Sequence, residues 1–429
     1  MSFILSAPTS GSGKTTVTLG LLAALRRRGL RIRGAKSGPD YIDPMFHAAA
    51  TGQPCVNLDA WAMQPEQIRS LAQGTGKLIV EGAMGLFDGA PPDGGGSTAD
   101  LARILKLPVV LVVNSASMSH SVAALVQGFA KHDASVKIAG VILNNVGSER
   151  HERMLRAAID TTGLPVFGAL RRSDALARPS RHLGLVQAGE MPDLDAFLEN
   201  AAMQIERSLD LDALCALGPD PASPTHNAAP SPLTAPRRIA LARDAAFGFS
   251  YAHHVMELQK RGHQITYFSP LADDIVPEAD SVFLPGGYPE LHADRLAGAT
   301  HFLSSLREAA QSVPVTGECG GYMVLGEVLT DANGTEHKMA GLLPLHTTFK
   351  ERKLSLGYRT LRDRLTGADG LKAHEFHYAT TLRADGTALF DAEDAEGNSL
   401  GEIGLREGNV SGSFAHIIEP HDGALRLTP

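Results

Sequence analysis

The sequence contains few cysteines, no excess of positive charge and no long apolar segment. Its 429 residues include three cysteines, Cys55, Cys215 and Cys319, which lie far apart and lack the spacing of metal ligands. So few thiols suit a reducing cytoplasm. The formal net charge of -8 argues against a general nucleic-acid-binding protein, because phosphate backbones require a basic surface. No apolar run approaches the roughly 20 residues that cross a membrane. We therefore expect a cytoplasmic protein with neither a nucleic-acid nor a membrane partner.

The length and one proline-rich segment predict two domains. A chain of 429 residues is too long for one ordinary core. Residues 218–236 are dense in proline and have almost no large apolar side chain, so we interpret them as an extended linker. The predicted domains are therefore 1–217 and 237–429.

Both halves have the pattern of α/β domains, in which short apolar runs alternate with helix-spaced apolar residues. In the first half, a parallel sheet is predicted from the buried runs Phe3–Leu5, Arg31–Ala35, Lys77–Val80, Pro108–Val113 and Lys137–Leu143, with helices at Thr15–Arg28 and Val122–His132. In the second half, the strands are Arg238–Ala242, Gln264–Phe268, Ser281–Leu284 and Val313–Thr316, with a helix at Tyr251–Arg261. Ligands are expected at the carboxyl ends of the strands.

The first strand leads into a segment typical of a phosphate-binding loop, although Pro8 stands where the strict pattern has glycine. Small residues let backbone N–H groups surround phosphates, and the following helix N-terminus adds partial positive charge. Lys14 is expected to reach the outer phosphates of ATP, and Thr15 to bind Mg²⁺ through its hydroxyl. The predicted nucleotide-binding residues are Ser10, Gly11, Ser12, Gly13, Lys14, Thr15 and Thr16.

Acidic residues after two predicted strands could complete the metal site, because Mg²⁺ is held by one or two carboxylates besides phosphate and water. Asp40 and Glu81 are the candidates, with Thr15. The alternatives are a turn-forming role for Asp40 and a solvent-facing charge for Glu81. Asp88 could orient substrate or form a turn, and Lys36 could pair with a phosphate or substrate carboxylate or be a surface lysine.

In the second half, Cys319 lies between a short buried strand and a helix predicted to begin at residues 320–326. A thiol at such a turn can act as a nucleophile, and we expect the helix N-terminus to favour the thiolate. The neighbouring glycines would allow an acyl substrate to approach. Gly286, Gly287 and Gly320 are the candidates for oxyanion stabilisation and glutamine binding.

A cysteine nucleophile needs a base, and His416 is the preferred candidate at the end of a strand predicted over 409–416. The competing candidates, His374 and His377, fall on opposite faces of another predicted strand. Zinc ligation by this pair is therefore not expected. They are interpreted as core groups or substrate contacts.

Taken together, these segments resemble the cobyrinic acid a,c-diamide synthase family over essentially the whole chain. The resemblance is carried by residues 7–16, 38–44 with 46–50, 81–89, 284–290, 317–321, 375–378 and 415–416. It implies an N-terminal domain like dethiobiotin synthetase and a C-terminal class I glutamine amidotransferase domain. It also implies that ATP phosphorylates the a and c acetate carboxylates of a corrin ring and that ammonia from glutamine displaces the phosphate.

The resemblance implies a role for each matching residue. Lys14 and Thr15 would hold ATP and Mg²⁺, and Asp40 and Glu81 would complete the metal site. Further implied roles are substrate activation by Asp88, substrate contacts by Tyr41 and Ile42, nucleophilic attack by Cys319 and activation of this thiol by His416. The implied partners are hydrogenobyrinic or cobyrinic acid and L-glutamine, and a homodimer is left open as the assembly.

The catalytic triad of the amidotransferase domain departs from the usual pattern. Many class I members have glutamate two residues after the histidine, where this sequence has Ile418. Glu419 should point to the other face of a strand. We therefore expect a Cys–His dyad.

Two alternative functions share part of this pattern. One is cobyric acid synthase, which amidates other corrin side chains, but its chains are usually longer and residues 38–44 favour the a,c enzyme. The other is a nucleotide-dependent switch with a non-catalytic amidotransferase-like domain. Thr9 stands where such switches have a second lysine, and the cysteine turn is intact, so both features weaken that alternative.

Overall fold

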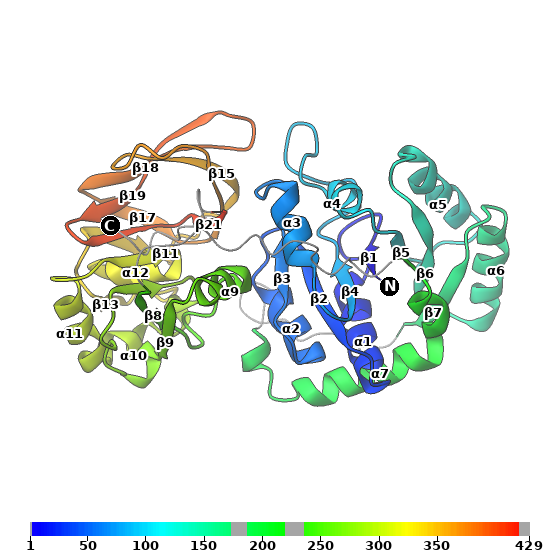
Figure 1. Ribbon diagram of the computed structural model, residues 1–429, viewed down its shortest axis with the longest axis horizontal. Helices are drawn as coiled ribbons and strands as arrows, with labels where there is room; N and C mark the ends of the chain where they lie inside the picture. The colour runs from blue at the N-terminus through cyan, green and yellow to red at the C-terminus, as the bar shows by residue number, and fades with distance from the viewer. Residues whose placement is uncertain (1, 173–186, 219–235, 420–429) are drawn as a thin grey trace. The chain divides into compact units, whose positions relative to one another are not determined.

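The computed structural model describes residues 2–172, 187–218 and 236–419. By its contacts the chain divides into two compact units, residues 1–227 and 228–429 (Figure 1). The predicted linker, 218–236, lies outside the described residues except at its two ends.

The N-terminal unit contains a seven-stranded sheet in which every strand pair is parallel, in the order β3-β2-β4-β1-β5-β6-β7. The strands are β1 Phe3–Ser6, β2 Ile32–Ser37, β3 Val56–Leu58, β4 Lys77–Glu81, β5 Val109–Asn114, β6 Ile138–Val146 and β7 Val166–Arg171. The five predicted strands are all present, because apolar runs buried on both faces are typical of parallel sheets. The outer strands β3 and β7 were not predicted.

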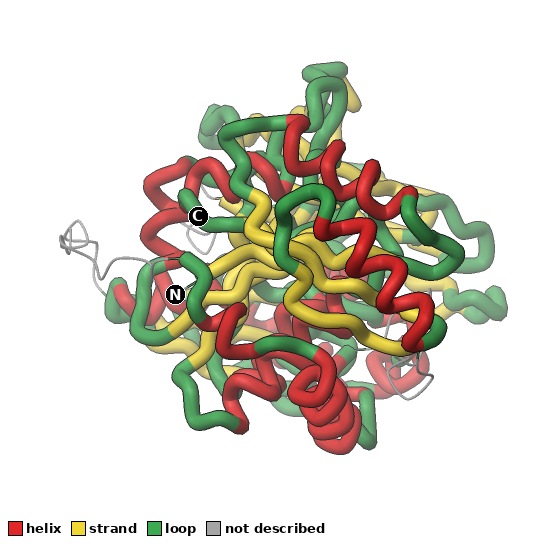
Figure 2. The backbone as a smooth tube through the Cα atoms, turned by 90° about the vertical axis from the view of Figure 1, so that its right-hand side faces the viewer, coloured by secondary structure: helices red, strands yellow, loops and turns green. Residues whose placement is uncertain are grey.

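Helices cover both faces of this sheet (Figure 2). They are α1 Lys14–Arg27, α2 Ile42–Thr51, α3 Pro65–Ala72, α4 Thr98–Leu105, α5 Ser121–His132, α6 Glu149–Asp160, the 3₁₀ turn η3 Ala188–Glu190, α7 Leu194–Ser208 and α8 Leu211–Cys215. The contact between α1 and α7 is close, since a Cβ on Gly20 would lie 2.7 Å from Ile205 Cγ1. Strand β1 leads through the phosphate-binding loop into α1, and α7 packs closely against this helix.

The C-terminal unit is built on a ten-stranded mixed sheet, in the order β21-β16-β15-β18-β19-β20-β11-β10-β8-β9. The strands from β20 to β9 are parallel, and the others pair antiparallel. The parallel strands are β8 Arg238–Ala242, β9 Gln264–Phe268, β10 Ser281–Leu284, β11 Val315–Glu318 and β20 Val410–Ser413. The antiparallel part adds β15 Ser355–Asp363, β16 Leu371–His377, β18 Thr387–Glu393, β19 Ser399–Glu407 and β21 His416–Glu419.

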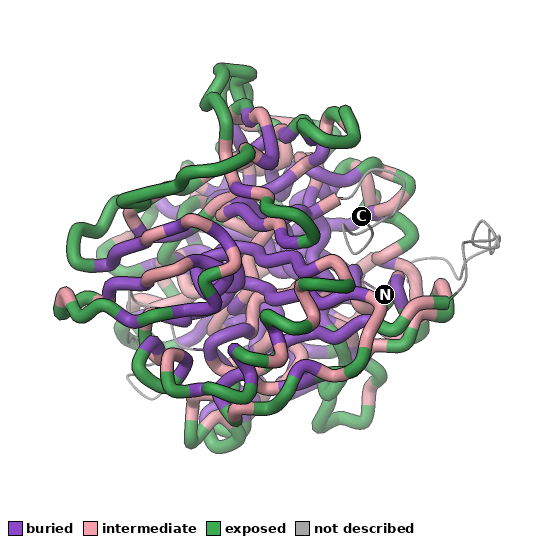
Figure 3. The backbone as a smooth tube through the Cα atoms, turned by 90° about the vertical axis from the view of Figure 1, so that its left-hand side faces the viewer, coloured by how far each residue is buried: buried purple, intermediate pink, exposed green. Residues whose placement is uncertain are grey.

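A smaller four-stranded sheet and short helices complete this unit. The sheet contains β12 Val328–Thr330, β13 Glu336–Lys338, β14 Leu345–Thr348 and β17 Thr380–Ala384. The helices are α9 Ala252–Lys260, α10 Ala293–Gly298, α11 Thr300–Ala309 and α12 Gly320–Leu325, with 3₁₀ turns η4 Pro270–Ala272 and η5 Pro289–Leu291. Figure 3 shows buried chain through the centre of the unit and exposed turns around it.

One predicted strand is corrected by the structure. Residues 409–416 were expected to form a single strand ending at His416, but β20 ends at Ser413 and His416 begins β21. The chain changes partner there: Ser413 pairs with Glu318 in β11, whereas His416 pairs with His374 in β16. The correction places the histidine at the start of a strand rather than at its end.

No helix among the described residues has both the length and the apolar character that crossing a membrane requires.

Two candidate active sites

The phosphate-binding loop has a backbone that needs glycine. Gly11 and Gly13 have φ values of 75° and 89°, in the left-handed region that disfavours other residues. A Cβ on Gly13 would also lie 2.2 Å from Asn144 Nδ2, the group that donates to the Ser12 carbonyl at 3.0 Å. Ser12 Oγ donates to the Thr9 carbonyl at 2.8 Å. The loop is therefore held in shape by its own contacts and by β6.

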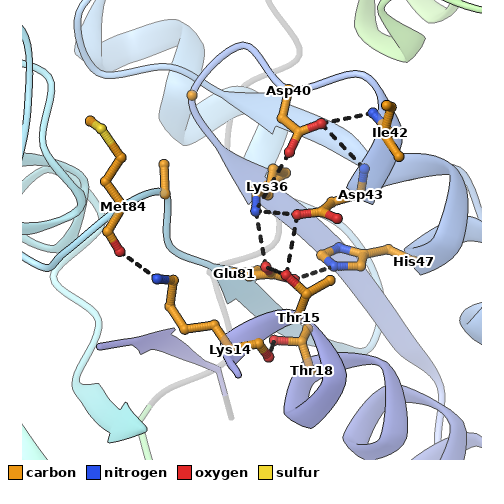
Figure 4. Close-up of polar contacts among 12 residues, drawn as sticks. Lys14, Thr15, Thr18, Lys36, Asp40, Ile42, Asp43, His47, Glu81 and Met84 are labelled. Atoms are coloured by element: carbon orange, nitrogen blue, oxygen red, sulfur yellow. Dashed lines mark hydrogen bonds and ion pairs between the residues drawn. The ribbon is translucent and has the colours of Figure 1, made fainter. Parts of the chain in front are cut away.

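The loop after β4 lies against the phosphate-binding loop. Lys14 Nζ donates to the Met84 carbonyl, and burial together with the nearby Lys36 lowers the pKa of Lys14 (Figure 4). Asp88 accepts a hydrogen bond from the Gly85 amide at 2.8 Å. Asp88 thus forms a turn in the structure, and its predicted role in substrate activation stays a prediction.

A buried lysine joins the acidic residues of this site. Lys36 Nζ lies 2.6 Å from Asp43 Oδ2, 2.9 Å from Glu81 Oε1 and 3.8 Å from Asp40 Oδ2 (Figure 4). The Lys36 side chain is 6% exposed, and the Glu81 side chain is fully buried. Burial by itself would lower the pKa of Lys36, but the facing carboxylates outweigh it and raise the pKa. Lys36 is therefore a charged core residue rather than a surface lysine.

The predicted metal ligands are only partly brought together. Thr15 Oγ1 donates to Glu81 Oε1 at 2.5 Å and contacts Asp43 Oδ2 at 3.3 Å. Asp40 instead accepts from the backbone amides of Ile42 and Asp43 at the start of α2, at 2.7 and 3.3 Å. Asp43, three residues after Asp40 in the same acidic segment, was not chosen from the sequence. Its place in the first turn of a helix is what directs it toward Thr15.

The same helix brings a histidine to Glu81. His47 Nε2 lies 2.7 Å from Glu81 Oε2, and Cys55 Sγ lies 3.5 Å from His47 Nδ1. Burial would lower the pKa of His47, but the contacts with Cys55 and Glu81 raise it to about 10. Burial would raise the pKa of Glu81, but Lys36 and His47 lower it. Glu81 is therefore a carboxylate between two cationic groups.

Within the described residues, no group of three or more His, Cys, Asp or Glu side chains is arranged as a ready-made metal site. The donor chemistry nevertheless fits Mg²⁺, since Thr15, Asp43 and Glu81 present hard oxygen atoms toward one another beside the phosphate-binding loop. The Lys36 ammonium group contacts both Asp43 and Glu81, so these two carboxylates already face a positive charge. Nearby, Tyr41 is half-buried and Ile42 is buried, and their predicted corrin contacts stay predictions.

In the C-terminal unit, Cys319 lies at a sharp turn between β11 and α12. Its φ of 48° and ψ of -102° are strained for a residue with a side chain, and such strain is common at catalytic turns. The Cys319 amide donates to the Ser413 carbonyl at 2.8 Å, which fixes the turn against β20. A Cβ on Gly321 would lie 1.9 Å from the Leu284 carbonyl oxygen, so only glycine lets α12 approach β10 this closely.

The structure brings the predicted nucleophile and base together. A Cβ on Gly286 would lie 3.2 Å from Cys319 Cβ, 2.3 Å from His416 Cε1 and 3.0 Å from His416 Nε2. Both side chains thus lie against the same glycine, and the Cε1–Nε2 edge of the His416 ring faces it. Cys319 is 4% and His416 2% exposed.

The predicted oxyanion glycines come from two adjacent loops. A Cβ on Gly320 would lie 3.0 Å from the Gly287 amide nitrogen and 2.9 Å from Pro289 Cδ. The Gly320 amide also contacts the Cys319 thiol as a hydrogen-bond donor. The proximity of Gly286, Gly287 and Gly320 agrees with the predicted grouping, and their role toward an oxyanion stays a prediction.

Burial and nearby carboxylates oppose the expected effect of the helix N-terminus on the Cys319 thiolate. Burial raises the pKa of Cys319, and the Glu290 carboxylate raises it further; the Gly320 amide opposes this shift, and Glu375 and Glu318 add to it. Helix α12 has six residues, and burial with three nearby carboxylates acts against the effect of its N-terminus. A thiol whose pKa is raised in this way needs a base to act as a nucleophile.

The competing histidines are held in other contacts. His374 pairs with His416 across β16 and β21, and burial together with His416 lowers the pKa of His374 to about 3. His377 contacts Glu375 Oε1 at 2.8 Å and stacks on Phe414 at 3.9 Å between ring centroids. These contacts favour His416 as the base.

A carboxylate that was not predicted as a site residue lies beside His416. Glu318 Oε2 is 3.5 Å from His416 Nδ1, and Glu318 Oε1 accepts from the Ile417 amide at 3.2 Å. Ile418, where many class I members have glutamate, is fully buried. Glu318 is brought next to His416 by the pairing of β11 with β20 and by the start of β21. No local pattern in the sequence predicts this contact.

Comparisons with known proteins match both units. Residues 3–186 match the CobQ/CobB/MinD/ParA nucleotide binding domain, and residues 238–423 match the CobB/CobQ-like glutamine amidotransferase domain. The chain is 56% identical to the hydrogenobyrinate a,c-diamide synthase of Brucella anthropi, 52% to that of Rhizobium meliloti and 53% to that of a Sinorhizobium species. Each alignment covers 97% of this chain and 98% of the relative.

Proposed function

This chain belongs to the family of the hydrogenobyrinate a,c-diamide synthases, and we propose that it amidates the a and c acetate carboxylates of hydrogenobyrinic or cobyrinic acid in cobalamin biosynthesis. ATP and glutamine are the co-substrates, since the two units match a nucleotide-binding and a glutamine amidotransferase family model. The observation that carries the proposal is the presence of a phosphate-binding loop with an acidic cluster and a buried Cys–His pair in one chain.

In the N-terminal unit, the proposed step is transfer of the γ-phosphoryl group of ATP to a corrin carboxylate. The loop amides from Ser10 to Lys14 bind the phosphates, and the Lys14 ammonium group neutralises charge on the outer ones. Thr15, Asp43 and Glu81 would hold Mg²⁺, which when bound neutralises phosphate charge. Lys36, released from one of its carboxylates, could also face a phosphate or the substrate carboxylate.

Phosphorylation is needed because a carboxylate is a poor electrophile. The acyl phosphate that forms has a leaving group, and ammonia attacks its carbonyl carbon and displaces phosphate to leave an amide. Ammonia must stay unprotonated until it reacts, which favours delivery from the glutaminase unit without loss to bulk water. Asp88, near Lys14, is the proposed group for substrate activation.

In the C-terminal unit, the proposed step is hydrolysis of the glutamine side-chain amide. His416 Nε2 takes the proton of the Cys319 thiol as sulfur attacks the amide carbon, and then gives a proton to the departing ammonia. Water next hydrolyses the thioester with His416 as base, and glutamate leaves. The amides of Gly287 and Gly320 are the proposed donors to the oxyanion.

The test compares wild type with Cys319→Ala, supplied with hydrogenobyrinic acid, ATP and either glutamine or ammonium. We expect wild type to release ADP and form the diamide with either nitrogen source, and Cys319→Ala to do so with ammonium alone. If neither protein changes the corrin mass with ammonium, the substrate is wrong. If glutamine supports both proteins equally, Cys319 is not the nucleophile.

Cytoplasmic location and homodimer formation remain proposals. Sedimentation of the purified chain at micromolar concentration would test the second.

A further inference from the structure

We propose that Glu318 is the positioning residue for His416 and completes a Cys–His–Glu triad from the residue directly before the nucleophile. This inference rests on the proposed glutaminase function of Cys319, and it departs from the dyad that the sequence suggested. Glu318 Oε2 lies 3.5 Å from His416 Nδ1, whereas the other ring nitrogen, Nε2, lies toward Gly286, the glycine that Cys319 also lies against. This is an ion-pair distance, and catalytic hydrogen bonds are often longer before substrate binds.

The Glu318 carboxylate is held in place from its other oxygen. Glu318 Oε1 accepts a hydrogen bond from the Ile417 amide at 3.2 Å, directly after His416 in the chain. Glu318 is 8% and His416 2% exposed, so water screens the pair weakly. One carboxylate thus binds the backbone of β21 through one oxygen and faces the imidazole of the same strand through the other.

Strand pairing explains why the residue before the nucleophile can do this. Glu318 ends β11 and pairs with Ser413 at the end of β20. The chain then turns, and His416 begins β21, so the cysteine turn and the histidine strand meet at the carboxyl end of the sheet. The usual triad position holds Ile418, whose side chain is fully buried. With Glu318 on β11 as the carboxylate, His416 would have a charged partner while position 418 keeps its buried isoleucine.

The other carboxylates near Cys319 are engaged differently. Glu375 contacts His377 through Oε1 at 2.8 Å and Arg359 through Oε2 at 2.8 Å. Glu290 acts on the thiol as a negative charge and raises the pKa of Cys319. Glu318 lies within ion-pair distance of His416.

This position gives Glu318 two opposing effects on the nucleophile. Directly, its negative charge disfavours the Cys319 thiolate. Through His416, it stabilises the imidazolium that forms when the thiol loses its proton, and it fixes the tautomer with Nε2 free to accept. If the proposal is right, the second effect is the larger, and removing the carboxylate makes the thiol less reactive. If Glu318 only repels charge, removing it makes the thiol more reactive.

The experiment measures the rate of Cys319 alkylation by iodoacetamide in the full-length chain at pH 7, with Cys55 and Cys215 distinguished by peptide mass. Glu318→Gln keeps an acceptor for the Ile417 amide, and we expect it to slow alkylation and lower the kcat for glutamine hydrolysis about 10- to 100-fold, part of the roughly 100- to 10,000-fold that a general base contributes. Glu290→Gln is the matched control, which also removes one negative charge near Cys319. It should speed alkylation.

A second comparison separates positioning from a structural role. In a His416→Ala background, Glu318→Gln should slow alkylation no further, because the group through which it acts is gone. An equal or faster rate in Glu318→Gln, or an undiminished effect of Glu318→Gln in the His416→Ala background, would overturn the proposal. If Glu318→Gln does not fold, Glu318→Asp, which keeps the charge but withdraws it from His416, carries the same expectation of slower alkylation.

Alkylation requires neither corrin nor glutamine, so this test is independent of the substrate assignment. Failure of wild type to hydrolyse glutamine would count against the proposed function, whereas fast alkylation in Glu318→Gln with an active wild type would count against Glu318 alone.

Discussion

Replacing Lys36 with methionine should destabilise the N-terminal unit strongly. The ammonium group is 2.6 Å from Asp43 and 2.9 Å from Glu81 in a site where the Lys36 side chain is 6% exposed. Methionine fills a similar volume but leaves both carboxylates without this cation. The structure thus predicts a loss from uncompensated buried charge rather than from a cavity.

The magnitude follows from which partners remain. Removing one member of a buried ion pair costs about 3 to 5 kcal/mol. Here His47 still contacts Glu81 at 2.7 Å, and Thr15 still donates to it, so Glu81 keeps part of its compensation. We therefore expect a loss near the lower end, about 3 kcal/mol.

The assay is urea unfolding followed by fluorescence of Trp61, the single tryptophan of the chain, which lies in the N-terminal unit. The control is Arg69→Met, whose pair with Glu66 at 3.2 Å joins side chains that are 48% and 80% exposed. That pair should contribute less than about 1 kcal/mol. A loss below about 1 kcal/mol for Lys36→Met as well would refute the reasoning that Lys36 compensates buried charge.

Three further outcomes follow from the two sites. Gly286→Ala should reduce glutaminase turnover by at least about 100-fold, because its Cβ would lie 2.3 Å from the His416 ring, whereas Gly298→Ala, which meets nothing within 4 Å, should not. Gly13→Ala should abolish ATP binding measured by calorimetry, whereas Gly29→Ala, with a similar positive φ of 76° but open space, should cost only about 1 to 2 kcal/mol of stability. The pKa of Glu81 is lowered from 4.5, so the stability that its charge contributes is present above about pH 4.5 and is lost as the pH falls further. At pH values below about 4.5, the urea concentration at the unfolding midpoint should therefore decrease less steeply with falling pH in Glu81→Gln than in wild type.

The parts of the fold that follow from local patterns were predictable. The buried strands of the N-terminal sheet, the phosphate-binding loop and the strand, turn and helix around Cys319 each depend on residues close together in the chain. The antiparallel strands β15, β18 and β19 were not predicted, since half-exposed strands with weak alternation give little signal. The break between β20 and β21 depends on a change of pairing partner that no local pattern specifies.

The candidate sites divide in the same way. Local motifs identified four of the site residues, Lys14 and Thr15 in the phosphate-binding loop and Cys319 and His416 in the second unit. The structure places the members of each pair close together. Contacts between strands that lie far apart in the sequence could not be predicted from it. The burial of Lys36 among carboxylates and the approach of Glu318 to His416 arise from register and crossover connections.

The most direct test of the central claim, that glutamine hydrolysed at Cys319 supplies nitrogen for an ATP-dependent amidation, is an isotope competition. Hydrogenobyrinic acid and ATP are supplied with glutamine labelled with ¹⁵N in its side-chain amide, together with unlabelled ammonium, and the mass of the corrin product is measured. The account predicts a diamide carrying ¹⁵N in both amides from wild type and an unlabelled diamide from Cys319→Ala. A labelled product from Cys319→Ala, or an unlabelled one from wild type, would contradict it.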